Sequence, residues 1–264
     1  MAFIRIGNRV LHWSGAGRRE GPALVFINSL GSDFRIWAAV VEQLAPHYRI
    51  VLYDKTGHGL SDVSSACCTI DSHVDDLAGL LDALRIDHSA IVGLSVGGII
   101  AQRFEVRESG RAKALVLCDT AAKIGIHESW TSRIEAVKKG GLESIADAVV
   151  ERWVTAEFRR DRSAELKGWR NMLVRMPAEG YIATCVALRD ADLRRDASLI
   201  RAPTLCLVGD EDGATPPDLV RGTAALIPGA RFEVITGAGH LPCIEKPAQL
   251  SRLIMSHLKE AGHV

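Results

Sequence analysis

The chain has 264 residues, and its 32 Lys and Arg balance 32 Asp and Glu, so its formal net charge is zero. This balance argues against a nucleic-acid partner and against a basic membrane-binding patch, both of which require clustered positive charge. Apolar residues make up 47% and charged residues 24%, which is typical of a globular protein large enough to fold without disulfides or metals.

The sequence has no segment typical of a membrane span or a signal peptide. No apolar run reaches the roughly 18 residues that a membrane helix requires, and residues 1–5 lack the charged-then-apolar order of a signal peptide. We therefore expect a cytoplasmic protein. In that compartment the six cysteines are expected to be reduced and structural; they are Cys67, Cys68, Cys118, Cys185, Cys206 and Cys243.

Short apolar runs recur along the chain and predict strands. Residues 3–6 and 10–13 flank Gly7 and Asn8, which predicts a hairpin at the edge of a sheet. Later runs are apolar almost throughout and end at turn residues, as do strands that are buried on both faces of a parallel sheet. These runs are residues 23–27, 50–53, 90–94, 114–118 and 204–208, followed by 232–235.

Helical periodicity separates these runs. Asp71 is the predicted N-cap of a helix with Val74, Leu77, Leu80, Leu81 and Leu84 on one face. A last helix follows Pro247, with Leu250, Leu253, Ile254 and Leu258 on its apolar face. The alternation predicts an α/β fold, with a mostly parallel, doubly wound sheet that carries helices on both faces.

The alternation stops between residues 121 and 196, where every segment has helical spacing. An all-helical insertion in an α/β chain predicts a small cap over one end of the sheet, so residues 1–120 and 197–264 form the core and 121–196 the cap. The helical stripes are Trp130, Ile134 and Val137; Leu142, Ile145, Val149 and Trp153; and Leu166, Trp169, Met172 and Leu173.

Residues 93–97, Gly-Leu-Ser-Val-Gly, stand between a predicted strand and a predicted helix. This is the context that the Gly-x-Ser-x-Gly nucleophile elbow requires. The serine takes a strained backbone conformation that exposes its hydroxyl, and the flanking glycines avoid clashes with neighbouring chain. We predict that Ser95 is a catalytic nucleophile.

A serine nucleophile needs a base and an acid that orients the base. In this type of fold the order is Ser, then Asp or Glu, then His. Asp210, Glu211 and Asp212 follow the strand 204–208, and His240 follows the strand 232–235. We choose His240 as the base and Asp212 as the acid, because Asp212 lies furthest beyond its strand, whereas Asp210 is expected to shape the turn.

The other histidines are given structural or surface roles. His58 lies in a tight loop and is predicted to be structural, whereas four histidines in polar surroundings are predicted to be surface residues; these are His47, His88, His257 and His263.

An oxyanion hole needs two backbone N–H donors. One is assigned to Val96, directly after the nucleophile, and the other to Leu30, in the loop after the strand 23–27. The chain has no His-Glu-x-x-His motif, no Cys/His ligand cluster and no phosphate-binding or dinucleotide glycine motif, so we predict no metal and no cofactor.

The whole chain resembles the 3-oxoadipate enol-lactonases of the α/β-hydrolase superfamily. The segments that carry the resemblance are 28–31 (Asn-Ser-Leu-Gly), 53–62, 93–98, 209–212 and 215–217, with 124–125, 130–133, 151–153 and 189–193 in the cap. The elbow and triad motifs belong to the superfamily at large. The oxyanion loop and the cap segments are more particular to the lactonases, since many relatives have His-Gly at positions 28 and 29.

The resemblance implies opening of the 3-oxoadipate enol-lactone ring to give 3-oxoadipate, in the β-ketoadipate pathway of aromatic-acid breakdown. That substrate carries a carboxylate, which an arginine fork suits. Arg133, one helical turn after Trp130, is the predicted partner, and Trp130 is a predicted apolar wall. The alternative that Arg133 is only a solvated surface residue stays open.

Other functions share these motifs. Another carboxylesterase or a perhydrolase of the same fold would use the same triad, and specificity would lie in the cap. A non-catalytic receptor for a small ligand is a further alternative, because a fold does not fix a function. The sequence does not determine the oligomeric state.

Overall fold

The computed structural model describes residues 1–63 and 68–264 and contains one eight-stranded sheet. Cys67 lies outside the described residues. The strand order is β1-β2-β4-β3-β5-β6-β7-β8. The strands are β1 (Ala2–Ile6), β2 (Arg9–Gly17), β3 (Ala23–Ile27), β4 (Arg49–Tyr53), β5 (Ser89–Leu94), β6 (Ala112–Cys118), β7 (Thr204–Gly209) and β8 (Arg231–Ile235).

The sheet confirms the predicted α/β class. β1 and β2 form the predicted antiparallel hairpin, and β2 also runs antiparallel to β4. From β4 to β8 all neighbouring strands are parallel. All carboxyl ends of these parallel strands therefore meet at one edge of the sheet, where ligand sites of α/β folds form.

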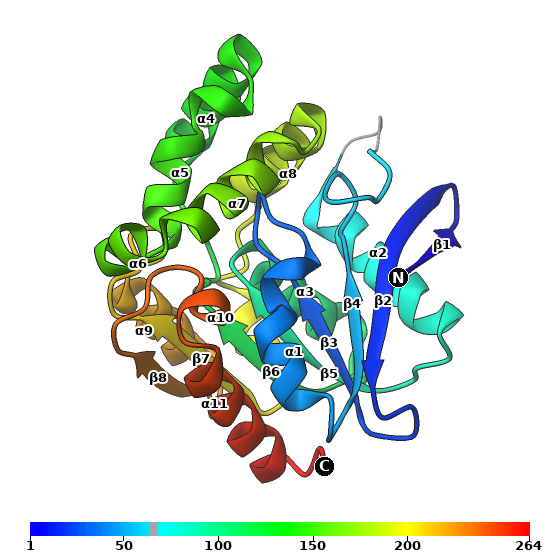
Figure 1. The fold of residues 1–264 in the computed structure, drawn as a ribbon. Coiled ribbons are helices and arrows are strands. Elements are labelled where there is room, and N and C mark those ends of the chain that lie inside the picture. Colours follow the sequence, from blue (N-terminus) through cyan, green and yellow to red (C-terminus); the bar gives the residue numbers. More distant parts are fainter. Residues whose placement is uncertain (64–67) are drawn as a thin grey trace.

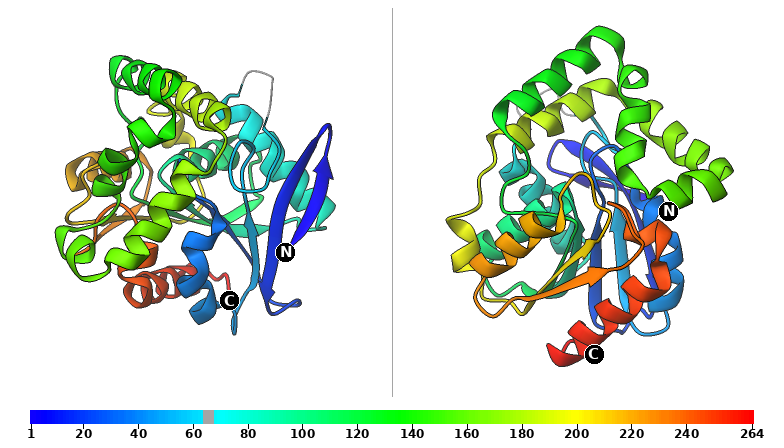
Figure 2. Two further views of the ribbon diagram at one scale, coloured as in Figure 1. Left: turned by 45° about the horizontal axis from the view of Figure 1, so that its top comes forward. Right: turned by 90° about the vertical axis from the view of Figure 1, so that its left-hand side faces the viewer.

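Helices cover both faces of the sheet (Figures 1 and 2). Helices α1 and α11 pack together on one face, and α2 and α3 pack together on the other. The helices flanking the sheet are α1 (Ala38–Leu44), α2 (Ile70–Ala83), α3 (Val96–Arg107), α9 (Pro217–Leu226), α10 (Pro242–Glu245) and α11 (Pro247–Glu260). Short 3-10 helices are η1 (Phe34–Trp37), η2 (Leu142–Ser144) and η3 (Asp196–Leu199).

Between β6 and β7 the chain forms only helices, which lie together beyond the carboxyl edge of the sheet (Figure 2). They are α4 (His127–Gly140), α5 (Ala146–Trp153), α6 (Ala156–Asp161), α7 (Ser163–Val174) and α8 (Ala178–Asp190). Here we call α4–α8 the cap helices; the division of the chain at 121 and 196 stays a prediction. The predicted stripe 142–153 is split, because η2 and Ile145 precede the start of α5.

The predicted N-cap of α2 is wrong. Thr69, not Asp71, caps the helix: Ser72 N donates to Thr69 Oγ1 and Thr69 N donates to Ser72 Oγ, both over 3.0 Å. This reciprocal pair satisfies two N–H groups at once. Asp71 lies in the first turn, where it pairs with Arg103 at 2.7 Å.

Two of the four histidines predicted on the surface are instead buried. His257 and His263 are 4% and 9% exposed. His257 contacts the carbonyl oxygen of Pro203 at 3.2 Å, and His263 contacts that of Ala23 at 2.8 Å. A backbone partner of this kind allows a neutral imidazole to be buried, and burial lowers the pKa of both rings.

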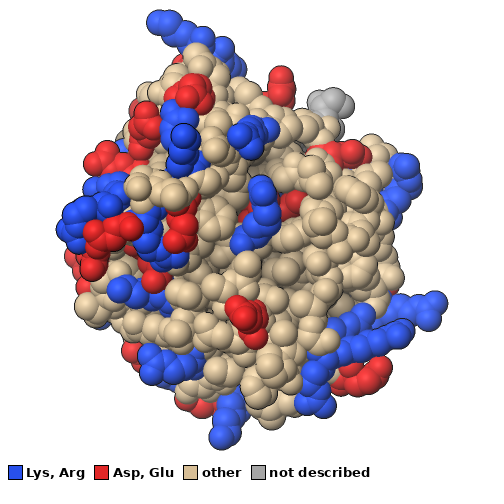
Figure 3. All heavy atoms as spheres, viewed as in Figure 1, with Lys and Arg blue, Asp and Glu red and all other residues tan. Residues whose placement is uncertain are grey.

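No helix in the described residues has the length and apolar character needed to cross a membrane. On the face drawn in Figure 3, basic and acidic side chains are interspersed. Cys118, Cys185, Cys206 and Cys243 are free and buried, and Cys68 is buried as well.

Candidate active site

Ser95 is the single residue between the end of β5 and the start of α3. Its φ is 57° and its ψ is −117°, a conformation that non-glycine residues rarely adopt. A Cβ at Gly97 would clash with the carbonyl oxygen of Ile27, and one at Gly93 would clash with that of Gly97. The glycines of the predicted elbow are therefore required by close backbone approach. Thr120 Oγ1 also donates to Ser95 O at 2.6 Å.

His240 and Asp212 are in direct contact. The distance from His240 Nδ1 to Asp212 Oδ2 is 2.9 Å, and both side chains are buried. Thr215 Oγ1 donates to Asp212 Oδ2 at 2.6 Å, while the N–H groups of Ala214 and Thr215 donate to Oδ1. Because an ionised carboxylate only accepts, the Nδ1 atom of His240 carries the proton and Nε2 keeps a free lone pair.

The electrostatics favour an ionised Asp212. Burial raises the pKa of this carboxyl, but the charge and hydrogen bonds of His240 and the hydrogen bonds of Thr215 outweigh burial and leave the pKa below its usual value. The loop that carries His240 is firmly held, although it contains two glycines: Asp210 accepts from Gly237 N at 2.7 Å, and Glu245 accepts from Gly239 N at 2.7 Å.

A second buried acid, Asp119, follows β6. Its carboxylate, that of Asp212 and a ring nitrogen of His240 lie within 4.8 Å of one another. Burial and the Asp212 charge hold the pKa of Asp119 well above its usual value, which favours the protonated form of this carboxyl. Its Oδ1 accepts from Gly209 N at 2.9 Å, at the end of β7. The expectation that the enzyme needs no metal and no cofactor stays a prediction.

One small cavity, of about 130 Å³, brings most of the predicted residues together. Ser95, His240 and Leu30 line it, and Trp130 and Arg133 close it from α4. Asp212 lies behind His240. The guanidinium of Arg133 lies over the Trp130 ring at 5.1 Å, and Trp130 Nε1 donates to Ile124 O at 2.7 Å. Trp130 is therefore fixed as a wall of the cavity.

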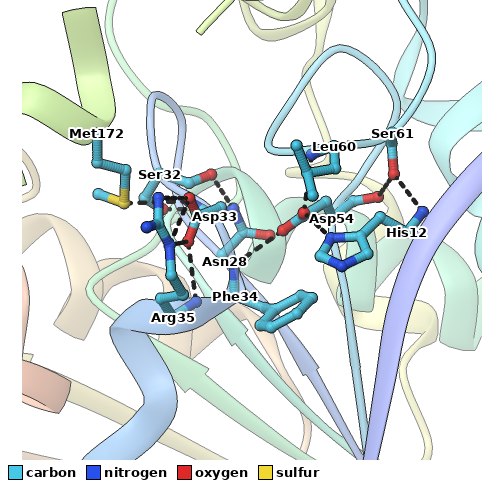
Figure 4. Close-up of polar contacts among 10 residues, drawn as sticks. All are labelled: His12, Asn28, Ser32, Asp33, Phe34, Arg35, Asp54, Leu60, Ser61 and Met172. Atoms are coloured by element: carbon cyan, nitrogen blue, oxygen red, sulfur yellow. Dashed lines mark hydrogen bonds and ion pairs between the residues drawn. The ribbon is translucent and has the colours of Figure 1, made fainter. Parts of the chain in front are cut away.

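The two predicted oxyanion donors also lie at this edge of the sheet. In the described part of the chain, neither the Leu30 nor the Val96 N–H has a hydrogen-bond acceptor. Val96 begins α3, where the helix leaves its first N–H groups unpaired and concentrates positive potential. The loop that carries Leu30 is braced by Asn28, whose side-chain amide donates to Ser32 O (Figure 4).

Sequence reasoning missed several residues at the site. Arg152 lines the cavity as a second arginine, and Thr215 holds Asp212. Lys55 and His58 contact the Leu30 loop from the segment after β4. A lysine two residues after a buried strand is a signal that could have been used, since it places an amine near the carboxyl edge of the sheet.

Residues 24–253 match the alpha/beta hydrolase family, and the chain belongs to this family. It is 33% identical to 3-oxoadipate enol-lactonase 1 of Acinetobacter baylyi, over 92% of this chain and 91% of that protein. It is 30% identical to 3-oxoadipate enol-lactonase 2 of the same organism, over 94% and 93% of the two chains.

A solved structure gives the same result. The crystal structure of the enol-lactonase from Burkholderia xenovorans LB400 has a TM-score of 0.95 and 34% sequence identity, and the match covers 98% of this chain and all of that one (100%). The resemblance to the enol-lactonases that the motifs predicted is confirmed. The chain is thus an enzyme, a hydrolase of carboxylic esters or lactones.

Proposed function

We propose that this enzyme opens the ring of 3-oxoadipate enol-lactone to give 3-oxoadipate, as a step of aromatic-acid catabolism through the β-ketoadipate pathway. The observation that carries the proposal is the bond between His240 and Asp212, placed in a cavity whose wall includes Ser95 on its strained turn. The likeness to enol-lactonases supports the choice of substrate. A cytoplasmic location belongs to the proposal and is supported by four free, buried cysteines, Cys118, Cys185, Cys206 and Cys243.

In the first half of the proposed reaction, His240 Nε2 takes the hydroxyl proton of Ser95 while Oγ attacks the lactone carbonyl. The N–H groups of Leu30 and Val96 stabilise the resulting oxyanion. The ring C–O bond then breaks, and His240 gives its proton to the departing enol oxygen. The enol tautomerises to the ketone, and the acyl group stays bound to Ser95.

In the second half, His240 removes a proton from water as the water attacks the acyl carbonyl. The bond to Ser95 Oγ breaks, His240 returns the proton to Oγ, and the acid is released. Asp212 keeps the proton on Nδ1 throughout and stabilises the positive charge on the ring.

Hydrolysis of enol-lactone generated in situ tests this proposal. We expect rapid loss of its ultraviolet absorbance with the wild-type enzyme. Loss at the uncatalysed rate, together with cleavage of a simple aryl ester, would leave an ester hydrolase and would exclude this lactone as the substrate. A fluorophosphonate probe tests the remaining alternative. A serine hydrolase should react with the probe, whereas a non-catalytic receptor should not.

Arg133 is the proposed partner of the substrate carboxylate, and Trp130 the proposed wall. Arg133→Met is expected to raise KM for the enol-lactone by ~10- to 100-fold, because a hydrogen bond to a charged group contributes ~1.5–3 kcal/mol. KM for an uncharged aryl ester should stay the same, since it has no carboxylate to bind. Steady-state kinetics with both substrates measure the difference.

Arg152→Met is the matched control, because Arg152 also lines the cavity but is exposed. A rise in KM for the lactone in Arg152→Met only would move the carboxylate site to Arg152. Equal changes for the charged and the uncharged substrate in Arg133→Met would limit Arg133 to packing on Trp130.

A further inference from the structure

Lys55 is a completely buried lysine that the proposed reaction does not use. It follows β4 and is 0% exposed. Buried lysines are rare and require partners. The partners of the Lys55 ammonium are two carbonyl oxygens of the loop after β3: Nζ donates to Ser29 O at 2.8 Å and to Asn28 O at 3.3 Å. Lys55 therefore binds the loop that carries Leu30.

Ser29 O and the Leu30 N–H belong to the same peptide unit. All peptide bonds of the described residues are trans, so the C=O and N–H of a peptide point in opposite directions. A donor fixed on Ser29 O therefore sets the direction of the Leu30 N–H. Leu30 lines the cavity together with Ser95, and its N–H has no acceptor among the described residues.

We propose that Lys55 is a positioning residue of the oxyanion hole, which orients the Ser29–Leu30 peptide and polarises it from the side opposite the substrate. This inference rests on the proposed function, in which Leu30 is an oxyanion donor. A hydrogen bond to the oxygen of an amide makes its N–H a stronger donor, and a charged donor has the larger effect.

Among the described residues, Lys55 is the only charged group that donates a hydrogen bond to Ser29 O. Ser29 O also accepts from Ser32 Oγ at 3.0 Å and from Ser32 N at 3.4 Å, and both donors are neutral. On the other side of Leu30, the N–H of Gly31 donates to His58 Nε2 at 3.2 Å. The loop is thus held on both sides of Leu30. The hydrogen bonds from Ser32 to Ser29 O allow the effect of a neutral donor to be compared with that of the charged donor Lys55.

The surroundings of Lys55 make its charge sensitive to pH. Burial lowers its pKa to about 7, although the nearby carboxyl groups of Asp54 and Asp33 act in the opposite direction. His58 and His73 are the other titratable groups near it. Burial and the Lys55 charge lower the pKa of both, that of His73 to about 3, so both stay neutral. Arg9, which faces His73 from β2, pairs with Asp76.

The expected pH dependence has a definite sign. As pH rises through the pKa of Lys55, the ammonium loses its proton and becomes a weaker donor to Ser29 O, so kcat should fall. Lys55 is therefore expected to give the pH profile of kcat an alkaline limb.

The test is the pH profile of kcat from pH 5 to 9 with an uncharged aryl ester, for the wild type, Lys55→Met and Ser32→Ala. Loss of one direct oxyanion donor costs ~10²–10³ in kcat, so we expect a smaller loss of ~10- to 100-fold for Lys55→Met, which acts through the peptide. KM should change little and the alkaline limb should disappear. Ser32→Ala should lose less activity and keep the limb.

Lys55→Gln is a second variant, to be used if Lys55→Met does not fold. The glutamine amide is neutral but can still donate a hydrogen bond to the loop. We expect partial activity without the alkaline limb. An alkaline limb that persists in either variant, or a wild-type profile with no limb near pH 7, would overturn the proposal. So would parallel changes in kcat and KM in a variant with wild-type thermal stability.

A stability measurement tests the ionisation without any catalysis. Between the folded pKa of about 7 and the unfolded value of about 10.4, the unfolded chain holds a proton at Lys55 that the folded chain has lost. The free energy of unfolding of the wild type should therefore rise relative to that of Lys55→Met across this range. A constant difference would exclude the shifted lysine, even if the enol-lactone were not the substrate.

Discussion

Replacing Ser95 by alanine is expected to lower kcat by ~10⁴- to 10⁶-fold, and replacing His240 by alanine should have an effect of the same size. In the proposed mechanism both side chains take part in the same proton transfer, from Ser95 Oγ to His240 Nε2. The double variant should therefore be little worse than either single variant.

The measurement is kcat for the three variants with enol-lactone and with an aryl ester. Ser95→Ala removes only Oγ and keeps the contact between Thr120 and Ser95 O, so its thermal stability should match the wild type. His240→Ala leaves the charge of Asp212 buried without its partner and should unfold at a lower temperature. His88→Ala is the control, since His88 is exposed, and it should retain full activity. If the free-energy cost to kcat in the double variant equalled the sum of the costs in the two single variants, Ser95 and His240 would not act as a cooperating pair.

The sheet and the strained turn at Ser95 could be predicted because their signals are local in the sequence. Ser95 stands between a strand and a helix that adjoin it in the chain, and the glycines that permit its backbone conformation are two residues away on either side. The predicted core strand 23–27 matches β3 at both ends, and the other core strands differ from the observed ones by one or two residues at one end. Helix starts were less certain: at Thr69 the capping side chain competes with Asp71, and hydrogen bonding to Ser72 decides the outcome.

Contacts between loops could not be predicted, because they depend on the order of strands in the sheet. Lys55 reaches the loop after β3 because β4 pairs with β3, although 26 residues separate Lys55 from Ser29. Asp119 lies beside Asp212 because β6 pairs with β7. The order of the strands in the sheet cannot be read from the periodicity of the sequence. The sequence therefore predicts Ser95, Asp212 and His240 as candidates, but not the residues that contact them in the fold.

Asp212→Asn is expected to lower kcat by ~10⁴-fold, because the change would force the wrong tautomer on the catalytic histidine. The two backbone N–H groups of Ala214 and Thr215 require an acceptor at Oδ1. The new amide nitrogen must then occupy the position of Oδ2, facing Nδ1 of His240. It donates to Nδ1, so the ring proton moves to Nε2, and His240 presents a donor to Ser95 in place of a lone pair.

Asp119→Asn is the matched control, because it makes the same change in the neighbouring buried acid. The raised pKa of Asp119 favours the protonated carboxyl, and an amide has nearly the same shape as that form: its oxygen can still accept from Gly209 N, and it carries no charge beside Asp212. We therefore expect a far smaller loss of kcat than in Asp212→Asn. Equal losses in the two variants would mean that the acids act as one pair, and a larger loss in Asp119→Asn would make Asp119 the acid that orients His240. A small loss in Asp119→Asn with a large one in Asp212→Asn would assign the charge that orients His240 to Asp212 alone.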